Sequence, residues 1–236
     1  MKTTESGQEI QPDQRRRKLF RGVSGGVGVL MAVQAKTALG GGVCASPSAI
    51  LSGNTSPRPN TGITCSGGRS PGYWKVPQHA SSWGAAGAVY PTFSTTVITC
   101  SSSGMSLLTL AAMTTPGTTW VTAGFGSSGF TVPSSLTVAP NIWAVLAFPG
   151  SFGTNGQLLR HLACAWLNAG LFTTSGAQYP LSRPQIIQMW NATKGGGLYY
   201  PTGVTSPSQA WSGAQVISYI QGMYDINSPD PTLCTL

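Results

Sequence analysis

The stretch Leu158-Leu159-Arg160-His161-Leu162-Ala163-Cys164-Ala165-Trp166-Leu167-Asn168-Ala169 repeats its apolar side chains at intervals of three and four residues. An α-helix has about 3.6 residues per turn, so this spacing returns apolar side chains to one side. We therefore predict a helix here with one face packed against the core. The residues that trace this face are Leu158, Leu159, Leu162, Ala163, Trp166, Leu167 and Gly170.

Capping residues mark three further helices around this stretch. Asn141 precedes the apolar run 142–148, Ser182 precedes a run with Pro184 in its first turn, and Ser212 precedes a third run. Asn and Ser at these positions accept backbone hydrogen bonds from the first turn. We predict a helical core over residues 141–225. The apolar faces of the last two helices are Ile186, Ile187, Met189 and Trp190, and Val216, Ile217, Ile220, Met223 and Tyr224.

Residues 90–140 have a different composition, dominated by Thr, Ser, Gly and Val. Short apolar or alternating runs between Gly and Pro indicate short strands or irregular extended segments. The fold class we predict for residues 65–236 is a single, mainly α domain with this Ser/Thr/Gly-rich insertion. The runs lie at 95–100, 119–122, 130–132 and 136–138, and a short helix is an alternative at 105–113.

The densest group of polar and aromatic side chains is Cys65-Ser66-Gly67-Gly68-Arg69-Ser70-Pro71-Gly72-Tyr73-Trp74-Lys75-Val76-Pro77-Gln78-His79-Ala80-Ser81-Ser82-Trp83. Ser70-Pro71-Gly72 is typical of a turn, which would present the residues after it. Exposed aromatic rings there would stack on sugars or anchor an interface, whereas buried rings would fasten the segment to the helices. The candidate binding residues are Tyr73, Trp74, Lys75, His79 and Trp83.

At residues 70–75, His79 and Trp83, the chain resembles a group of uncharacterised bacterial secreted or surface proteins. The group has a recurring Pro-Gly-(Tyr/Phe)-Trp-Lys motif, followed by a His and a Trp, usually with a Cys upstream. A second likeness is the Leu-x-Arg-His-x-x-Ala-x-x-Leu-Asn-Ala helix, which matches 158–169 in part. The resemblance covers about 65–83 and 140–225. It implies a location and an architecture, and no activity.

The first 45 residues have the order of an export signal. Arg15-Arg16-Arg17-Lys18-Leu19-Phe20 precedes a short glycine-containing apolar run and then small residues. The paired arginines resemble a twin-arginine signal, and cleavage after Ala35 or after Ala45 fits, with Ala45 preferred. We predict an exported protein, periplasmic, extracellular or on the cell surface, that meets a membrane only during export. Residues 46–64, rich in Pro, Ser, Asn and Thr, are predicted to be a disordered linker.

Charge is scarce once the predicted signal is removed. The whole chain carries a formal net charge of +8, of which residues 1–45 hold seven cations and three acids. Six cations and two carboxylates remain, giving +4. Paired-acid hydrolysis and calcium loops need more carboxylates than Asp225 and Asp230 provide. The remaining cations form no cluster of the kind that binds nucleic acid, so we predict no nucleic-acid partner.

Four cysteines would remain in an exported chain, and an even number suits two disulfides in an oxidising compartment. We prefer Cys65 with Cys100 and Cys164 with Cys234, which would staple the small helical core, although three pairings are possible. His161 and Cys164 lie three residues apart on one helix, a spacing that also allows a shared metal. We predict neither a metal nor a cofactor.

The function that these features favour is a non-enzymatic secreted or cell-surface protein with a structural or adhesive role. It would associate with itself or with a partner, since low charge reduces repulsion. The alternative is a carbohydrate-binding module that uses Tyr73, Trp74 and Trp83. A third hypothesis is an enzyme built on His79 or His161, although no phosphate-loop motif accompanies them.

Overall fold

The computed structural model describes residues 46–51, 66–93, 117–126, 129, 140–174 and 178–225. Helices are the only regular elements among these residues, which contain no strand, so the predicted mainly α class is confirmed. The elements are α2 (Pro47–Leu51), α3 (Pro71–Lys75), η2 (Pro77–His79), α4 (Ala80–Ala85), α6 (Ile142–Ala147), η3 (Pro149–Asn155), α7 (Gly156–Thr174), α8 (Arg183–Thr193), η4 (Pro207–Gln209) and α9 (Gly213–Met223).

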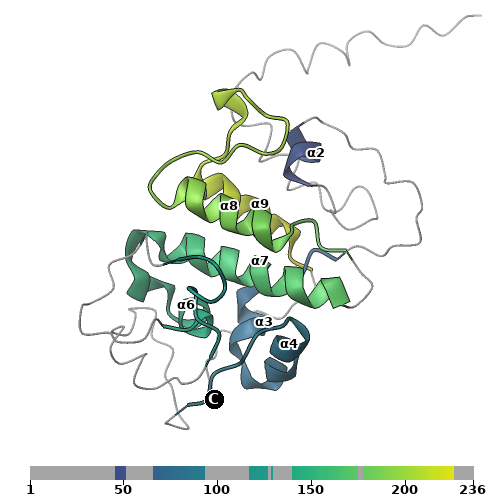
Figure 1. The fold of residues 1–236 in the computed structure, drawn as a ribbon, viewed down its shortest axis with the longest axis vertical. Coiled ribbons are helices and arrows are strands. Elements are labelled where there is room, and N and C mark those ends of the chain that lie inside the picture. Colours follow the sequence, from purple (N-terminus) through teal and green to yellow (C-terminus); the bar gives the residue numbers. More distant parts are fainter. Residues whose placement is uncertain are drawn as a thin grey trace, which may run out of the picture.

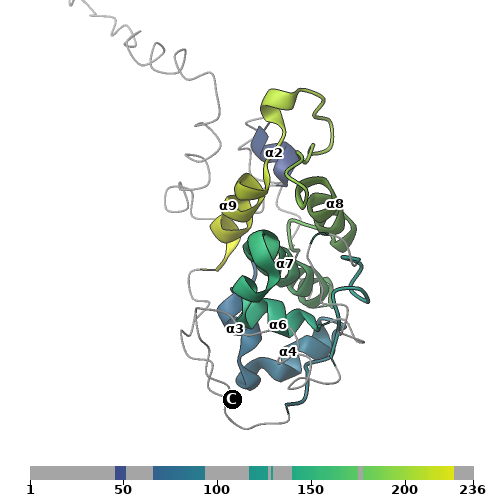
Figure 2. The same ribbon diagram turned by 90° about the vertical axis from the view of Figure 1, so that its left-hand side faces the viewer.

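Helix α7 runs through the middle of the molecule (Figures 1 and 2). Helices α8 and α9 pack on one side of it, and α3, α4 and α6 pack on the other side. We predicted a single apolar face for this helix. Instead, every residue from His161 to Ala169 is buried, because other helices cover α7 from both sides.

The predicted caps are confirmed. The Asn141 side chain accepts a hydrogen bond from the backbone of α6 at 2.9 Å. Ser182 and Ser212 each form a capping box, in which Gln185 and Gln215 return a bond to the capping residue. Each box satisfies N–H groups that the first turn of a helix leaves without partners. The sequence therefore located the start of α6, α8 and α9.

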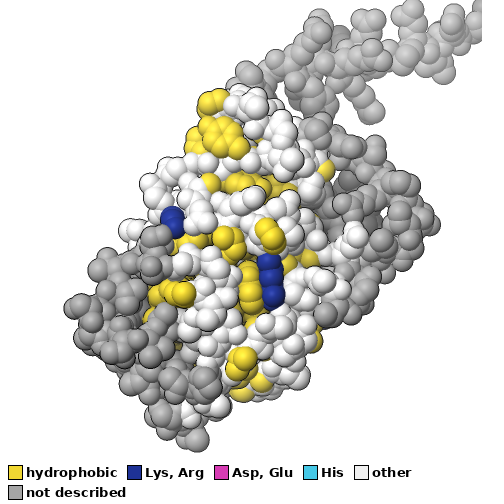
Figure 3. Space-filling model, viewed as in Figure 1, with side chains coloured by type: hydrophobic (Ala, Val, Ile, Leu, Met, Phe, Trp, Pro, Cys, Tyr) yellow, Lys and Arg dark blue, Asp and Glu magenta, His cyan; other side chains and the backbone are white. Residues whose placement is uncertain are grey.

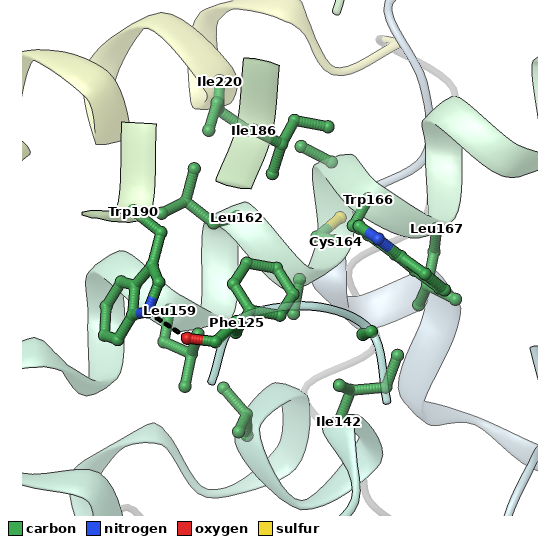
Figure 4. Close-up of a cluster of buried hydrophobic side chains, with 14 of the residues drawn as sticks. Phe125, Ile142, Leu159, Leu162, Cys164, Trp166, Leu167, Ile186, Trp190 and Ile220 are labelled. Atoms are coloured by element: carbon green, nitrogen blue, oxygen red, sulfur yellow. Dashed lines mark hydrogen bonds between the residues drawn. The ribbon is translucent and has the colours of Figure 1, made fainter. Parts of the chain in front are cut away.

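The hydrophobic core extends beyond the predicted helices (Figure 4). Leu159 and Leu162 of α7 and Ile186 of α8 belong to one buried cluster, in which Trp190 donates its indole N–H to the carbonyl of Phe125 at 2.9 Å. Phe125 belongs to the region that we predicted as an insertion. The core also takes residues from before α6, namely Trp74, Trp83, Trp120 and Phe125, all 1% exposed or less.

The run 119–122, predicted as a short strand or an irregular extended segment, is a turn that begins at Thr119, which forms an isolated bridge with Asn141. The Thr122 hydroxyl donates to the Thr119 carbonyl at 2.9 Å, and the Thr122 N–H bonds the Thr119 hydroxyl at 3.1 Å. Such local side-chain bonds compete with strand pairing, which explains why a β-branched run makes a turn here. The other predicted runs, and the alternative helix at 105–113, lie outside the described residues.

Residues 46–51 are not linker, in contrast to our prediction for 46–64. They form α2, whose Pro47 is buried and whose Ile50 and Leu51 pack against the core. The remainder of that predicted linker and the predicted export signal lie outside the described residues. No described helix has the length and apolar character needed to cross a lipid bilayer.

Candidate functional site

The predicted turn at Ser70 is the start of helix α3. The Ser70 hydroxyl accepts a hydrogen bond from the Tyr73 N–H at 3.4 Å, and Pro71 occupies the first helical position. Pro is favoured there, since its missing N–H would have no partner in any case. The turn prediction was wrong because Ser-Pro is also a helix start, and the residues after it continue as one helical turn.

Trp74 and Trp83 are fully buried, so neither presents a ring face to solvent. The Trp83 indole donates to the Trp74 carbonyl at 3.0 Å, and the Trp74 indole donates to the side-chain oxygen of Asn168 at 3.0 Å. The two rings meet edge to face, with centroids 6.2 Å apart. Two of the three rings that we predicted to stack on a sugar therefore belong to the core.

Lys75 is also buried, with 8% of its surface exposed. Its backbone carbonyl accepts two bonds, one from the Trp143 indole at 2.8 Å and one from the Tyr90 hydroxyl at 3.1 Å. Burial raises the pKa of Tyr90 to about 12, and the hydrogen bond with Trp143 opposes that shift. The Pro-Gly-Tyr-Trp-Lys motif thus joins α3 to α6 through its backbone.

Tyr73 and His79 form the part of the motif that remains half-exposed. Their rings stack with centroids 3.7 Å apart and 13° between planes, and the Arg69 guanidinium lies 5.2 Å from the Tyr73 centroid. The Tyr73 hydroxyl bonds Ser82 at 2.9 Å. Partial burial, and then the Arg69 charge, lower the pKa of His79. The Tyr73 ring covers one face of the His79 imidazole, and among the described residues the charged group nearest to this stack is the Arg69 guanidinium, which opposes protonation.

Asn168 is the residue that joins the two motifs, and the sequence analysis did not single it out. Its side-chain oxygen accepts from the Arg69 N–H at 2.9 Å, and its amide donates to the Arg69 carbonyl at 2.9 Å. The Cys164 thiol donates to the same carbonyl at 3.1 Å. Asn168 lies opposite the predicted apolar face of its helix, so the periodicity gave no signal that this amide would be buried and need hydrogen-bond partners.

His161 is buried and both of its ring nitrogens are engaged. The Gln221 amide nitrogen lies 3.2 Å from Nε2 and the Tyr224 hydroxyl lies 2.8 Å from Nδ1. An amide nitrogen only donates, so Nε2 accepts and Nδ1 carries the proton toward Tyr224. Burial, and then the charge of Arg160, lower the pKa of His161 to about 4. The imidazole is therefore held neutral between two helices.

Asp225 holds the start of the motif segment in place. Its carboxylate accepts from the Ser66 hydroxyl at 2.9 Å and from the Gly67 N–H at 3.2 Å. The Asp225 N–H in turn donates to the Gly68 carbonyl at 2.9 Å. A Cβ at Gly67 would overlap the Met223 carbonyl, so this close approach of the two segments requires glycine.

The predicted disulfide staple is not supported. The described part of the chain contains no disulfide, and Cys164 has a buried thiol that bonds Arg69. Cys65, Cys100 and Cys234 lie outside the described residues. Within the residues that the structure describes, no three His, Cys, Asp or Glu side chains gather into a group that could hold a metal ion.

No protein-family model, curated protein or solved structure matches the chain. The resemblance to bacterial secreted and surface proteins therefore stays a prediction. Of the predicted binding residues, Trp74, Lys75 and Trp83 are buried, whereas Tyr73 and His79 are half-exposed and stacked on each other.

Proposed function

We propose that this protein is an exported, non-enzymatic structural component that works by associating with further copies of itself. One observation carries the proposal. Among the described residues, no charged residue is fully exposed. Every one of them is buried or half-buried: Arg69, Lys75, Arg160, Arg183, Lys194 and Asp225.

The arginine and lysine side chains of α8 lie against aromatic rings. The Arg183 guanidinium lies 3.5 Å from the Trp166 centroid, and it donates to the Trp166 carbonyl at 3.2 Å and to the Ala86 carbonyl. The Lys194 ammonium lies 5.9 Å from the Trp190 centroid. These cations contribute to packing through their stems and ring contacts, as well as through their charge.

The surface formed by the described residues carries few charged groups. Figure 3 shows only small patches of Lys and Arg on one face, and no acidic side chain there. Charge repulsion between like molecules keeps proteins apart, so a surface that lacks it favours association. Exposed large apolar side chains add to this tendency. They are Val89, Val121, Leu198 and Tyr200.

Three of the groups suited to chemistry bond within the fold. Both nitrogens of His161 are engaged, the Cys164 thiol donates to a backbone carbonyl, and Asp225 accepts from Ser66 and Gly67. A general base needs a free nitrogen or oxygen within reach of a substrate proton. These contacts support a structural role, and the sequence pattern of residues 1–45 supports export.

The proposal is tested by sedimentation velocity on protein recovered from the periplasm or the medium of its host. We expect association that increases with protein concentration and that is equal at 50 and 500 mM NaCl (about 14 and 4 Å Debye lengths), because apolar and hydrogen-bonding contacts are not screened. A monomer at every concentration would contradict the proposal. Glycan binding by such a monomer would favour the carbohydrate-binding alternative.

A charge variant provides the matched comparison. Gln157, Gln188 and Gln209 are exposed, so the triple Gln→Lys variant adds three like charges without disturbing the core. We expect weaker association at 50 mM NaCl and recovery at 500 mM, where the added charges are screened. The triple Gln→Asn variant, uncharged at the same positions, should behave as the unmodified protein does.

A further inference from the structure

A single pair of backbone hydrogen bonds joins the segment after α8 to the segment before α9. Tyr199 and Trp211 exchange N–H to carbonyl bonds of 2.8 Å each, as an antiparallel bridge. Gly197 fixes the start of this segment, because a Cβ there would overlap the Ala192 carbonyl at the end of α8. Figure 1 shows the chain leaving α8 here and continuing to η4.

The residues on either side of Tyr199 have the opposite orientation. Successive residues of an extended chain direct their backbone groups to alternate sides. Since both groups of Tyr199 point toward Trp211, those of Leu198 and Tyr200 point away from it. The side chains alternate as well: Tyr199 is 5% exposed, whereas Leu198 is 40% and Tyr200 is 44% exposed. Residues 197–201 therefore form an edge segment with outward backbone groups and two exposed apolar side chains.

We propose that the edge segment pairs antiparallel with the same segment of a second copy of this chain. The inference rests on the proposed self-association and names its contact. The pairing centres on Tyr199, so that Leu198 of each copy exchanges backbone hydrogen bonds with Tyr200 of the other. The exposed Leu198 and Tyr200 side chains then meet across the pair, on one side of the new two-chain ladder. Such edge-to-edge addition of strands is a common mode of protein recognition.

A second copy is the occupant because the edge is complementary to itself. Two-fold pairing places each apolar side chain opposite an apolar one, and cross-strand aromatic–aliphatic pairs stabilise antiparallel ladders. Natural edges avoid such pairing with lysine or other charges, and the edge segment 197–201 contains none. Pro201 does not block the ladder, because by the same alternation its nitrogen lies on the Tyr199 side.

Two double variants of the full chain test the register. Leu198→Lys/Tyr200→Lys places like charges opposite each other in the two-fold pair, whereas Leu198→Lys/Tyr200→Glu places opposite charges there. At 50 mM NaCl, we expect the first to raise the dissociation constant about tenfold or more, and the second to change it by no more than about threefold. Sedimentation velocity gives the constants, and circular dichroism confirms that both variants fold.

Each result has one interpretation. If both variants weaken association equally, or if neither does, while the unmodified chain associates, the edge pairing is wrong and the proposed function stands. If the unmodified chain is monomeric throughout, both proposals are wrong. The double variant Gln157→Lys/Gln188→Lys adds the same net charge away from the edge. A loss in the like-charge variant that is about tenfold larger than in this control, with no loss in the opposite-charge variant, supports the pairing. An equal loss in the control means that the pairing is wrong.

Discussion

In segment 66–93 the indoles of Trp74 and Trp83 are fully buried and donate to atoms inside the fold, whereas in the edge segment 197–201 Tyr200 is 44% exposed. Both segments are rich in glycine and aromatic residues. The two segments differ in their hydrogen bonding. Polar groups of the first segment bond within the fold, including to Asn168 of α7, whereas the second segment has backbone groups that we infer to point outward. The more conspicuous aromatic motif thus packs within the fold, and the shorter edge is the segment that we propose for contact with other copies.

The largest effect on stability should come from Asn168, which bonds the first segment to α7. At a buried position, Asn168→Leu removes the partner of the Arg69 N–H and of the Trp74 indole, and one of the two donors to the Arg69 carbonyl. We expect a loss of about 4 kcal/mol in the free energy of unfolding, measured by urea titration. Asn191→Leu, at an exposed position of α8, is the control, with a change of less than about 0.5 kcal/mol. Equal effects would mean that the segment is not held by Asn168.

The next effect is a loss of stability in acid through His161. The pKa of the folded protein's imidazole lies near 4, below the ordinary 6.5, because burial and Arg160 oppose its charge. Stability from this group is therefore complete above pH 6.5 and is lost as pH falls through 4, on the order of 3 kcal/mol. Urea titrations between pH 7 and 4 should show this slope. His161→Gln should flatten it, and an unchanged slope would contradict the assignment.

A smaller effect is expected at the start of α8, which leads into the edge segment. Ser182→Ala removes the hydroxyl that accepts from the Gln185 N–H. Loss of such a cap costs about 1 kcal/mol, which thermal unfolding should resolve. Ser208→Ala removes an exposed hydroxyl that caps no helix and should cost less than about 0.5 kcal/mol.

The smallest effect on stability should come from the edge segment itself. Tyr200→Ser removes an exposed ring and should change the free energy of unfolding by less than about 0.5 kcal/mol. It should nevertheless weaken association, as measured by sedimentation velocity. Val121→Ser, at another exposed apolar position, should weaken association less than Tyr200→Ser does. An equal loss of association in both variants would indicate nonspecific hydrophobic association rather than a defined edge contact.

Local signals in the sequence were enough to place α6, α7, α8 and α9, but not α2 or α3. Ser182 and Ser212 cap α8 and α9 as predicted, because a capping box depends on residues only three positions apart. The long-range contacts were not predictable in this way. Asn168 forms hydrogen bonds with Arg69, which lies 99 positions away in the sequence, and no local sequence pattern predicts a partner at that separation. The Ser-Pro start of α3 was misassigned because turns and helix starts share the same residues.

Amide hydrogen exchange at low and high protein concentration measures both segments at once. The account predicts that the Arg69 amide and the Trp74 and Trp83 indole N–H groups are protected at both concentrations. The Leu198 and Tyr200 amides should exchange fast in dilute protein and become protected only in concentrated protein. Fast exchange of the two indoles, or Leu198 and Tyr200 amides that do not respond to concentration, would contradict the assignment of the first segment to the fold and the second to association.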